Sequence, residues 1–150
     1  MVKMSARKRA AYLSSLVMLA LVAAPAFAQT AANSLKEQLV GEWRLVSVDV
    51  GDAKPYGAHP QGAMFLDAGG RYSVIVISDG GARSVAYFGA YTVNDADKTV
   101  SMHIEASNRA NAVGRDEKRV ATVDGDSLTL ENQTPARSLG MIKLTWRRAQ

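Results

Sequence analysis

The sequence contains no cysteine, and only two of its 150 residues are histidine. Disulfide bonds are therefore excluded, and stability must come from packing and from sheet closure. The two histidines, His59 and His103, lie in unrelated segments, so the sequence predicts no metal site. Serine-hydrolase, zinc-protease and phosphate-loop motifs are also absent, and we expect no cofactor.

The sequence also lacks an apolar run long enough to span a membrane, which needs about 20 residues. Its main apolar run covers only residues 16–24, after a basic start that contains Lys3 and Arg7. Pro25 follows, and then the small residues Ala26 and Ala28. This order is typical of a cleaved signal peptide. We expect a signal peptide over 1–28, one domain over 29–150, no membrane anchor after cleavage, and a periplasmic or secreted protein.

The excess of basic residues belongs to the segment that is predicted to be removed. The chain has 18 basic and 14 acidic residues, and four of the basic residues lie in 1–28. The remaining domain therefore has a formal net charge of zero. A nucleic-acid partner would need a concentrated basic face, so we expect none.

The mature segment begins with one short helix and continues in strands. Ser34 and Glu37 fit a capping box, and Leu35 and Leu39 would form one apolar face of a helix over 34–39. Beyond it the apolar residues repeat every second position, and turn residues separate the runs. We predict eight strands, over 42–50, 63–66, 71–78, 84–93, 99–106, 115–123, 127–132 and 141–148.

The lengths of the connections favour a barrel. Tight turns are expected at 67–70, 94–98 and 124–125, and longer loops at 51–62, 79–83, 107–114 and 133–140. In an up-and-down meander, alternate connections lie at opposite ends, so the tight turns would form a floor and the long loops a rim. Eight strands also suffice to close a barrel around one small ligand. We therefore predict an all-β, eight-stranded antiparallel barrel, with a two-sheet sandwich as the alternative.

Several motifs carry a resemblance to a known family. Gly41-Glu42-Trp43 looks like the Gly-x-Trp signature of lipocalins and fatty-acid-binding proteins. Five further motifs begin at residues 56, 87, 99, 124 and 144: YGAHPQG, YFGAYTV, TVSMHIE, DGDSLTL and LTW. With these motifs, the chain resembles the bacterial lipocalin-like domain family from about residue 39 to residue 148. The resemblance implies a barrel but little about activity, although some relatives are linked to polyketide-type metabolism. It also implies that Arg148 stacks on Trp43 as a structural latch at the floor.

The candidate ligand contacts allow two orientations. His103 and Glu105 share one face of their strand, and the resemblance favours the inside of the barrel for them. Val100, Met102 and Ile104 form a more apolar face, which would place His103 and Glu105 in solvent. Arg119 would pair with Leu130 and face inward across a two-residue turn at 124–125, whereas a three-residue turn would turn Val120 inward instead.

The remaining candidates lie on the rim loops and on the 84–93 strand. Tyr56 and His59 are candidate lid contacts on the longest rim loop, and Tyr87 and Tyr91 belong to the YFGAYTV motif. Basic residues slightly exceed acidic ones on the rim loops, which favours an anionic ligand. We expect a protein that binds a small hydrophobic or amphipathic molecule. The alternatives are a small isomerase, cyclase or dehydratase, and a rim-loop interaction module with a filled barrel; the oligomeric state stays open.

Overall fold

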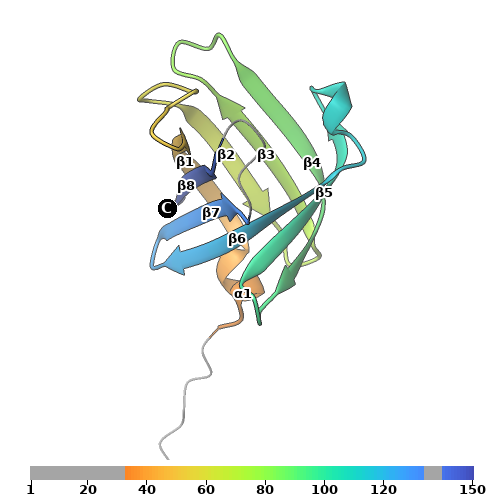
Figure 1. Ribbon diagram of the computed structural model, residues 1–150. Helices are drawn as coiled ribbons and strands as arrows, with labels where there is room; N and C mark the ends of the chain where they lie inside the picture. The colour runs from red at the N-terminus through yellow and green to blue at the C-terminus, as the bar shows by residue number, and fades with distance from the viewer. Residues whose placement is uncertain (1–32, 134–139) are drawn as a thin grey trace, which may run out of the picture. The chain divides into compact units, whose positions relative to one another are not determined.

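The protein forms a closed barrel in a computed structural model, which describes residues 33–133 and 140–150. Each strand pairs antiparallel with the next, and the last strand returns to the first (Figure 1). This confirms the predicted up-and-down barrel rather than the sandwich. The predicted signal peptide (1–28) lies outside the described residues, and so does Arg137, one of the basic residues counted on the rim loops. Within those residues, no helix is long and apolar enough to cross a membrane.

The eight strands lie within about two residues of their predicted positions. The elements are α1 (Leu35–Leu39), β1 (Gly41–Val50), β2 (Gln61–Leu66), β3 (Arg71–Ile77), β4 (Ser84–Asn94), β5 (Thr99–Ser107), the 3₁₀ turn η1 (Ala110–Ala112), β6 (Asp116–Asp124), β7 (Ser127–Asn132) and β8 (Ile142–Arg148).

The helix α1 closes one end of the barrel. The Ser34 hydroxyl accepts a hydrogen bond from the Glu37 amide at 3.2 Å, and the Glu37 carboxylate accepts one from the Ser34 amide at 2.8 Å, as the capping box predicted. Leu35 and Leu39 are buried in the core. The Leu35 amide donates to Asp95 Oδ1 at 2.7 Å, which ties α1 to the β4–β5 turn. This end is the floor.

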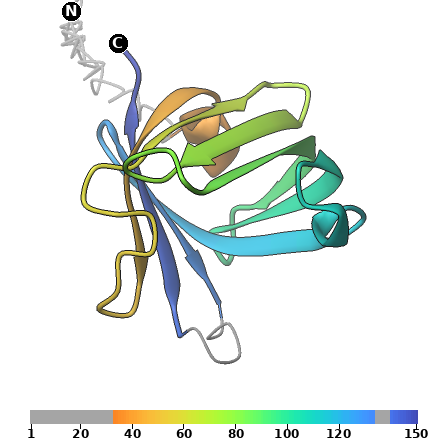
Figure 2. The same ribbon diagram turned by 90° about the horizontal axis from the view of Figure 1, so that it is seen from above.

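The long connections gather at the opposite end, which is the rim. They join β1 to β2, β3 to β4 and β5 to β6, and η1 lies in the last of these (Figures 1 and 2). The three other turns, between β2 and β3, β4 and β5, and β6 and β7, lie at the floor, as an up-and-down barrel requires. The sorting of loop lengths expected from the sequence is therefore present in these six connections, and the seventh, at 133–140, lies largely outside the described residues.

The β6–β7 turn lies one residue later in the chain than the sequence predicted, at 125–126 instead of 124–125. Asp124 pairs with Ser127, so the two central residues are Gly125 and Asp126. Arg119 consequently lies opposite Asn132 and not Leu130. A two-residue shift in register keeps every side chain on its own face, because the side-chain period of a strand is two. Arg119 therefore still faces inward, as expected from a two-residue turn.

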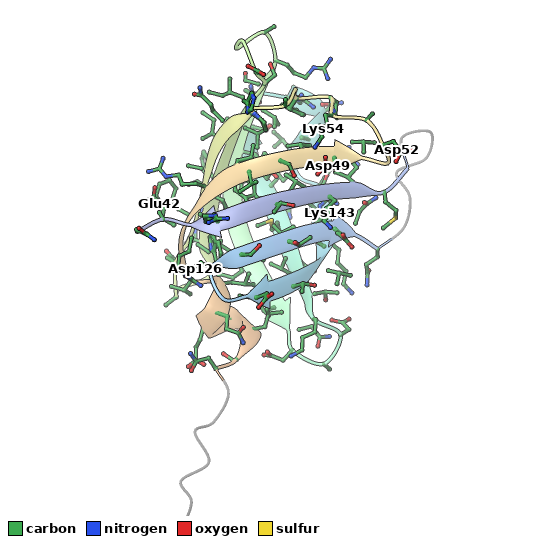
Figure 3. The ribbon with its side chains drawn as sticks, turned by 90° about the vertical axis from the view of Figure 1, so that its left-hand side faces the viewer. Glu42, Asp49, Asp52, Lys54, Asp126 and Lys143 are labelled. Carbon is green, nitrogen blue, oxygen red and sulfur yellow. The ribbon has the colours of Figure 1, made fainter. Side chains whose placement is uncertain are left out.

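The floor half of the barrel is filled with large side chains. Trp43 and Leu128 are completely buried, and Trp146 is almost as inaccessible. Met64 and Val100 belong to the same cluster. Outward positions carry both charged and apolar side chains. Phe65 and Phe88 are exposed there, and Lys54 Nζ forms an ion pair with Asp49 Oδ1 at 2.8 Å (Figure 3).

Trp43 joins the first strand, the helix and the last strand. The Arg148 guanidinium lies 4.2 Å from the centre of the Trp43 ring, in the contact that the resemblance implied. The same guanidinium donates to the carbonyl oxygens of Gln38 and Val40, at 2.6 and 3.1 Å. The Trp43 indole N–H donates to the Leu39 carbonyl at 2.8 Å. These contacts hold α1 against the seam between β1 and β8.

Replacing Trp43 by alanine should destabilise the barrel by roughly 3–5 kcal/mol, because it removes a buried aromatic side chain and leaves a cavity. Arg148→Met keeps the aliphatic stem and removes the cation–π contact, which is worth about 0.5–2 kcal/mol, along with its hydrogen bonds. Chemical denaturation of both variants measures these losses. A Trp43→Ala protein of unchanged stability that no longer bound ligand would contradict the structural role.

Candidate functional site

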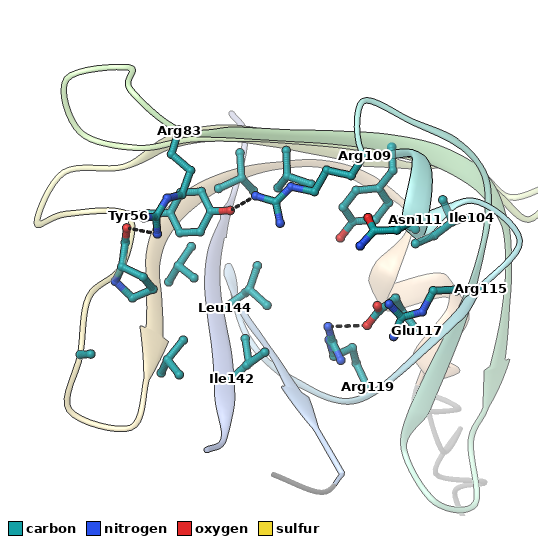
Figure 4. A pocket seen from close by; sticks show the side chains of 18 residues that line it. Tyr56, Arg83, Ile104, Arg109, Asn111, Arg115, Glu117, Arg119, Ile142 and Leu144 are labelled. Carbon is teal, nitrogen blue, oxygen red and sulfur yellow. Dashed lines mark hydrogen bonds and ion pairs between the residues drawn. The ribbon is translucent and has the colours of Figure 1, made fainter. Parts of the chain in front are cut away.

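A cavity of about 620 Å³ lies in the rim half of the barrel (Figure 4). A volume of about 300–1,000 Å³ is typical of small-molecule sites. Its apolar wall comes from β1, β3, β4, β5 and β8, through Val48, Val50, Val76, Val85, Ile104, Ile142 and Leu144. These inward positions follow the period of two in each strand, and the packed floor half ends the cavity below.

Charged side chains in the cavity lining are mostly arginines. Four arginines and one carboxylate line it: Arg83, Arg109, Arg115, Arg119 and Glu117. Within residues 33–133 and 140–150, Arg119 is the only one of these arginines that forms an ion pair. The lining therefore has three arginines that no carboxylate neutralises, and its formal charge is positive.

Three side chains from three different loops meet at the mouth of the cavity. Arg109 Nη2 lies 3.2 Å from the Tyr56 hydroxyl oxygen, and the Arg83 guanidinium lies 5.8 Å from the centre of the Tyr56 ring. Arg83 Nη1 also donates to the Pro55 carbonyl at 3.1 Å. In Figure 4, Tyr56 stands between the two arginines. We call Tyr56, Arg83 and Arg109 the rim cluster.

Backbone contacts between loops hold the rim cluster in place. The Asp79 amide donates to the Tyr56 carbonyl at 2.8 Å. Gly57 has a φ of +84°, and a Cβ there would lie 2.5 Å from the Asp79 Cβ, so only glycine permits this close approach. On the other side, the Asn108 amide donates to the Ala86 carbonyl at 3.0 Å, which ties the Arg109 loop to β4.

Glu117 and Arg119 form an ion pair inside the barrel, which we call the inner pair. Arg119 Nη2 lies 2.7 Å from Glu117 Oε2, and their side chains are 16% and 27% exposed. Both residues face the cavity because they are two apart on β6. The sequence analysis selected Arg119 but missed Glu117, although the equal parity of the two positions was a signal that could have found it.

Tyr87 contributes a phenol to the same wall. Burial is the main reason that its pKa rises to about 12, and the nearby Glu117 carboxylate adds to the rise while Arg119 opposes it. Tyr87 is therefore neutral at physiological pH and keeps its proton. Its ring packs edge-on against Tyr72, with the centroids 6.0 Å apart.

Tyr91 and His59 do not line this cavity. Tyr91 is buried near the floor, where its hydroxyl donates to the Asp67 carbonyl at 2.6 Å. Burial raises its pKa. His59 is exposed on the β1–β2 loop. Of the four aromatic or histidine candidates outside β5, the structure thus brings Tyr56 and Tyr87 to the cavity and leaves Tyr91 and His59 away from it.

The inward orientation considered for His103 and Glu105 is corrected by the structure. Both side chains are on the outer surface, while Met102 and Ile104 face inward. The physical reason is the alternation of β5, which buries the more apolar of its two faces. Outside, His103 Nδ1 lies 2.8 Å from an oxygen of Asp116.

On the outer face, Glu105 forms an ion pair with Arg71. Arg71 donates two parallel hydrogen bonds to its carboxylate, at 2.5 and 2.7 Å. These bonds lower the pKa of Glu105 below its ordinary value, and the charge of Arg71 adds to the effect. His103, Glu105 and Arg119 therefore do not form one constellation.

The available groups suit binding more directly than metal chemistry. Across the described part of the chain, no group of three or more potential metal-ligating histidine or acidic side chains lies close enough to hold an ion. The cavity instead combines apolar walls with guanidinium groups, which bind carboxylates through paired hydrogen bonds.

Replacing either His103 or Glu105, whose side chains point outward, should leave the affinity for the ligand unchanged. His103→Ala and Glu105→Gln alter side chains that point away from the cavity, so the dissociation constant of a fluorescent apolar probe is expected to stay within about twofold of wild type, a difference below about 0.5 kcal/mol. Fluorescence titration of each variant measures it. A large loss of affinity in a folded variant would contradict this prediction and show that the residue contributes to ligand binding.

The motifs and the barrel agree with a comparison against known families. A family model described as a lipocalin-like domain matches residues 78–149, which run from the end of β3 through β8 and include the inner pair, Arg83 and Arg109. No curated protein matches the chain. The resemblance expected from the motifs is thus confirmed over residues 78–149, where the chain matches the lipocalin-like domain model.

Proposed function

We propose that the protein binds a small amphipathic anion in the rim-half cavity. The observation that carries this proposal is the charge of the lining, in which three arginines lie beside apolar walls without a neutralising carboxylate among the described residues. The fold supports the coarser statement that a small molecule is bound, since an eight-stranded barrel is wide enough to hold one small ligand and this one has a cavity.

Two physical effects would act on such a ligand. Apolar surface that leaves water against Val48, Val76 or Leu144 contributes about 25 cal/mol per Å². A carboxylate or sulfonate near the arginines gains charge-assisted hydrogen bonds, which are stronger than those between neutral groups. The positive potential at the mouth also raises the rate at which an anion enters.

The two alternative functions have less support. The enzyme hypothesis depended on His103 and Glu105 facing the cavity, and both lie outside it. The interaction-module hypothesis depended on a barrel filled by its own side chains, whereas this barrel has a cavity of about 620 Å³. A binding protein therefore remains the function that the geometry supports best.

The test compares two fluorescent probes of nearly the same shape, anilinonaphthalene sulfonate and N-phenylnaphthylamine, which lacks the sulfonate. Both should bind with increased fluorescence, and the sulfonate should bind more tightly by roughly tenfold or more, as expected for charge-assisted hydrogen bonds of about 1.5–3 kcal/mol. Added salt should reduce this preference.

A long-chain fatty acid and the matching alcohol serve as competing ligands in the same assay. The acid should displace either probe at lower concentration than the alcohol. If neither probe binds, the cavity is not a ligand site. If both bind equally and the acid has no advantage, the anionic part of the proposal fails while the apolar part stands.

We further propose that the protein is exported and that cleavage occurs after Ala28, because a basic start, a short apolar run and Ala26-Phe27-Ala28 follow one another. Expression in a bacterial host should release a protein whose N-terminal sequence is Gln-Thr-Ala-Ala. Edman sequencing of the periplasmic fraction measures this. An intact N-terminus in the membrane fraction would contradict the proposal.

A further inference from the structure

We infer that the ligand binds with its anionic group outward, at the rim cluster, and that Glu117 prevents this group from reaching Arg119. The inference rests on the proposed function and adds the orientation of the ligand and a residue that determines it. Glu117 is then a specificity-determining residue. The ligand class is an amphiphile with one oxoanionic head, a carboxylate or a sulfonate, and an uncharged apolar tail.

The order of the two charges along β6 is the first argument. The strand runs from rim to floor, so Glu117 lies two residues nearer the mouth than Arg119 on the same inward face. Glu117 pairs with Met102 of β5, and Arg119 pairs with Val100, the second residue of β5 above the floor turn. An anion that enters from the rim therefore meets the carboxylate before the guanidinium.

The pairing of Arg119 is the second argument. Its guanidinium is already 2.7 Å from a Glu117 oxygen. A ligand carboxylate that took this place would exchange one ion pair for another and leave Glu117 beside it as a like charge without a partner. In a partly buried site an unpaired charge is strongly unfavourable. The deep end of the cavity therefore suits an uncharged group.

The rim cluster has the opposite character. Among the described residues, the guanidinium groups of Arg83 and Arg109 contact only neutral groups, namely the Pro55 carbonyl and the Tyr56 hydroxyl and ring. The Tyr56 oxygen accepts a hydrogen bond from Arg109, and among the described residues no acceptor takes its own proton, which can therefore be donated to a ligand. An oxoanion there would meet two guanidiniums and a phenol, all of them donors and none of them a negative charge.

The decisive experiment removes the charges of the inner pair and those of the rim cluster in separate variants, so that the effect of each site on anion binding is measured by itself. Arg119→Met alone is ambiguous, because it leaves the Glu117 carboxylate unpaired in the cavity. The double variant Glu117→Gln/Arg119→Gln removes the inner pair and keeps the net charge. The double variant Arg83→Gln/Arg109→Gln removes the two cations of the rim cluster, called the rim cations below, and keeps Arg115. Lys118→Gln/Lys143→Gln is the matched control, since it removes two cations that form ion pairs with Asp97 and Glu131 on the outer face.

Each variant is titrated with anilinonaphthalene sulfonate and N-phenylnaphthylamine, and the ratio of the two dissociation constants reports the preference for the anion. Loss of the rim cations should reduce this preference by about ten- to a hundredfold. Loss of the inner pair, and the outer-face control, should each change it by less than about threefold. Circular dichroism and thermal melting verify that each variant is folded.

Glu117→Gln alone provides an independent measurement. It frees Arg119 and should raise the affinity for the sulfonate while the affinity for the neutral probe stays the same. The inference is overturned if this variant has unchanged anion affinity, or if the preference disappears with the inner pair and survives loss of the rim cations. If wild type binds neither probe or shows no preference, the proposed function has failed instead.

Discussion

The pairing of β8 with β1 is the constraint on which the rest of the structure depends. It closes the barrel and removes both sheet edges, which a cysteine-free chain cannot secure with a disulfide. Trp43 and Arg148 lie opposite each other in this pairing, and their side chains stack. Because Arg148 also binds the carbonyls of Gln38 and Val40, the helix α1 is fixed to the same seam.

Because the floor half of the barrel is packed, the rim half can stay open. Large side chains such as Trp43, Trp146 and Met64 fill the floor half, whereas valines, Ile142 and Leu144 line the rim half and leave space between them. Stability therefore comes mainly from one end of the barrel. The other end is free to keep a cavity and loops of irregular length, an arrangement that suits ligand binding on a rigid scaffold.

The distribution of charge in the cavity then gives its two ends different properties. The inner pair is neutral as a unit, and the rim cluster is positive. A single carboxylate, Glu117, makes this difference. Without it the cavity would contain two guanidinium sites at different depths, and an anionic ligand would have two orientations of similar energy.

Much of the fold followed from the sequence alone, because strand periodicity, turn residues and loop lengths are local properties. The orientation of Arg119 depended on the length of the β6–β7 turn, and the observed two-residue turn places it inside, even though the register is shifted by two residues. The orientation of His103 depended on which face of β5 the barrel buries, and the more apolar face prevailed. Only the tertiary structure brought together Tyr56, Arg83 and Arg109, which come from three loops, and set Glu117 beside Arg119. Such contacts depend on how closure orients distant loops and side chains, and no local pattern in the sequence records that.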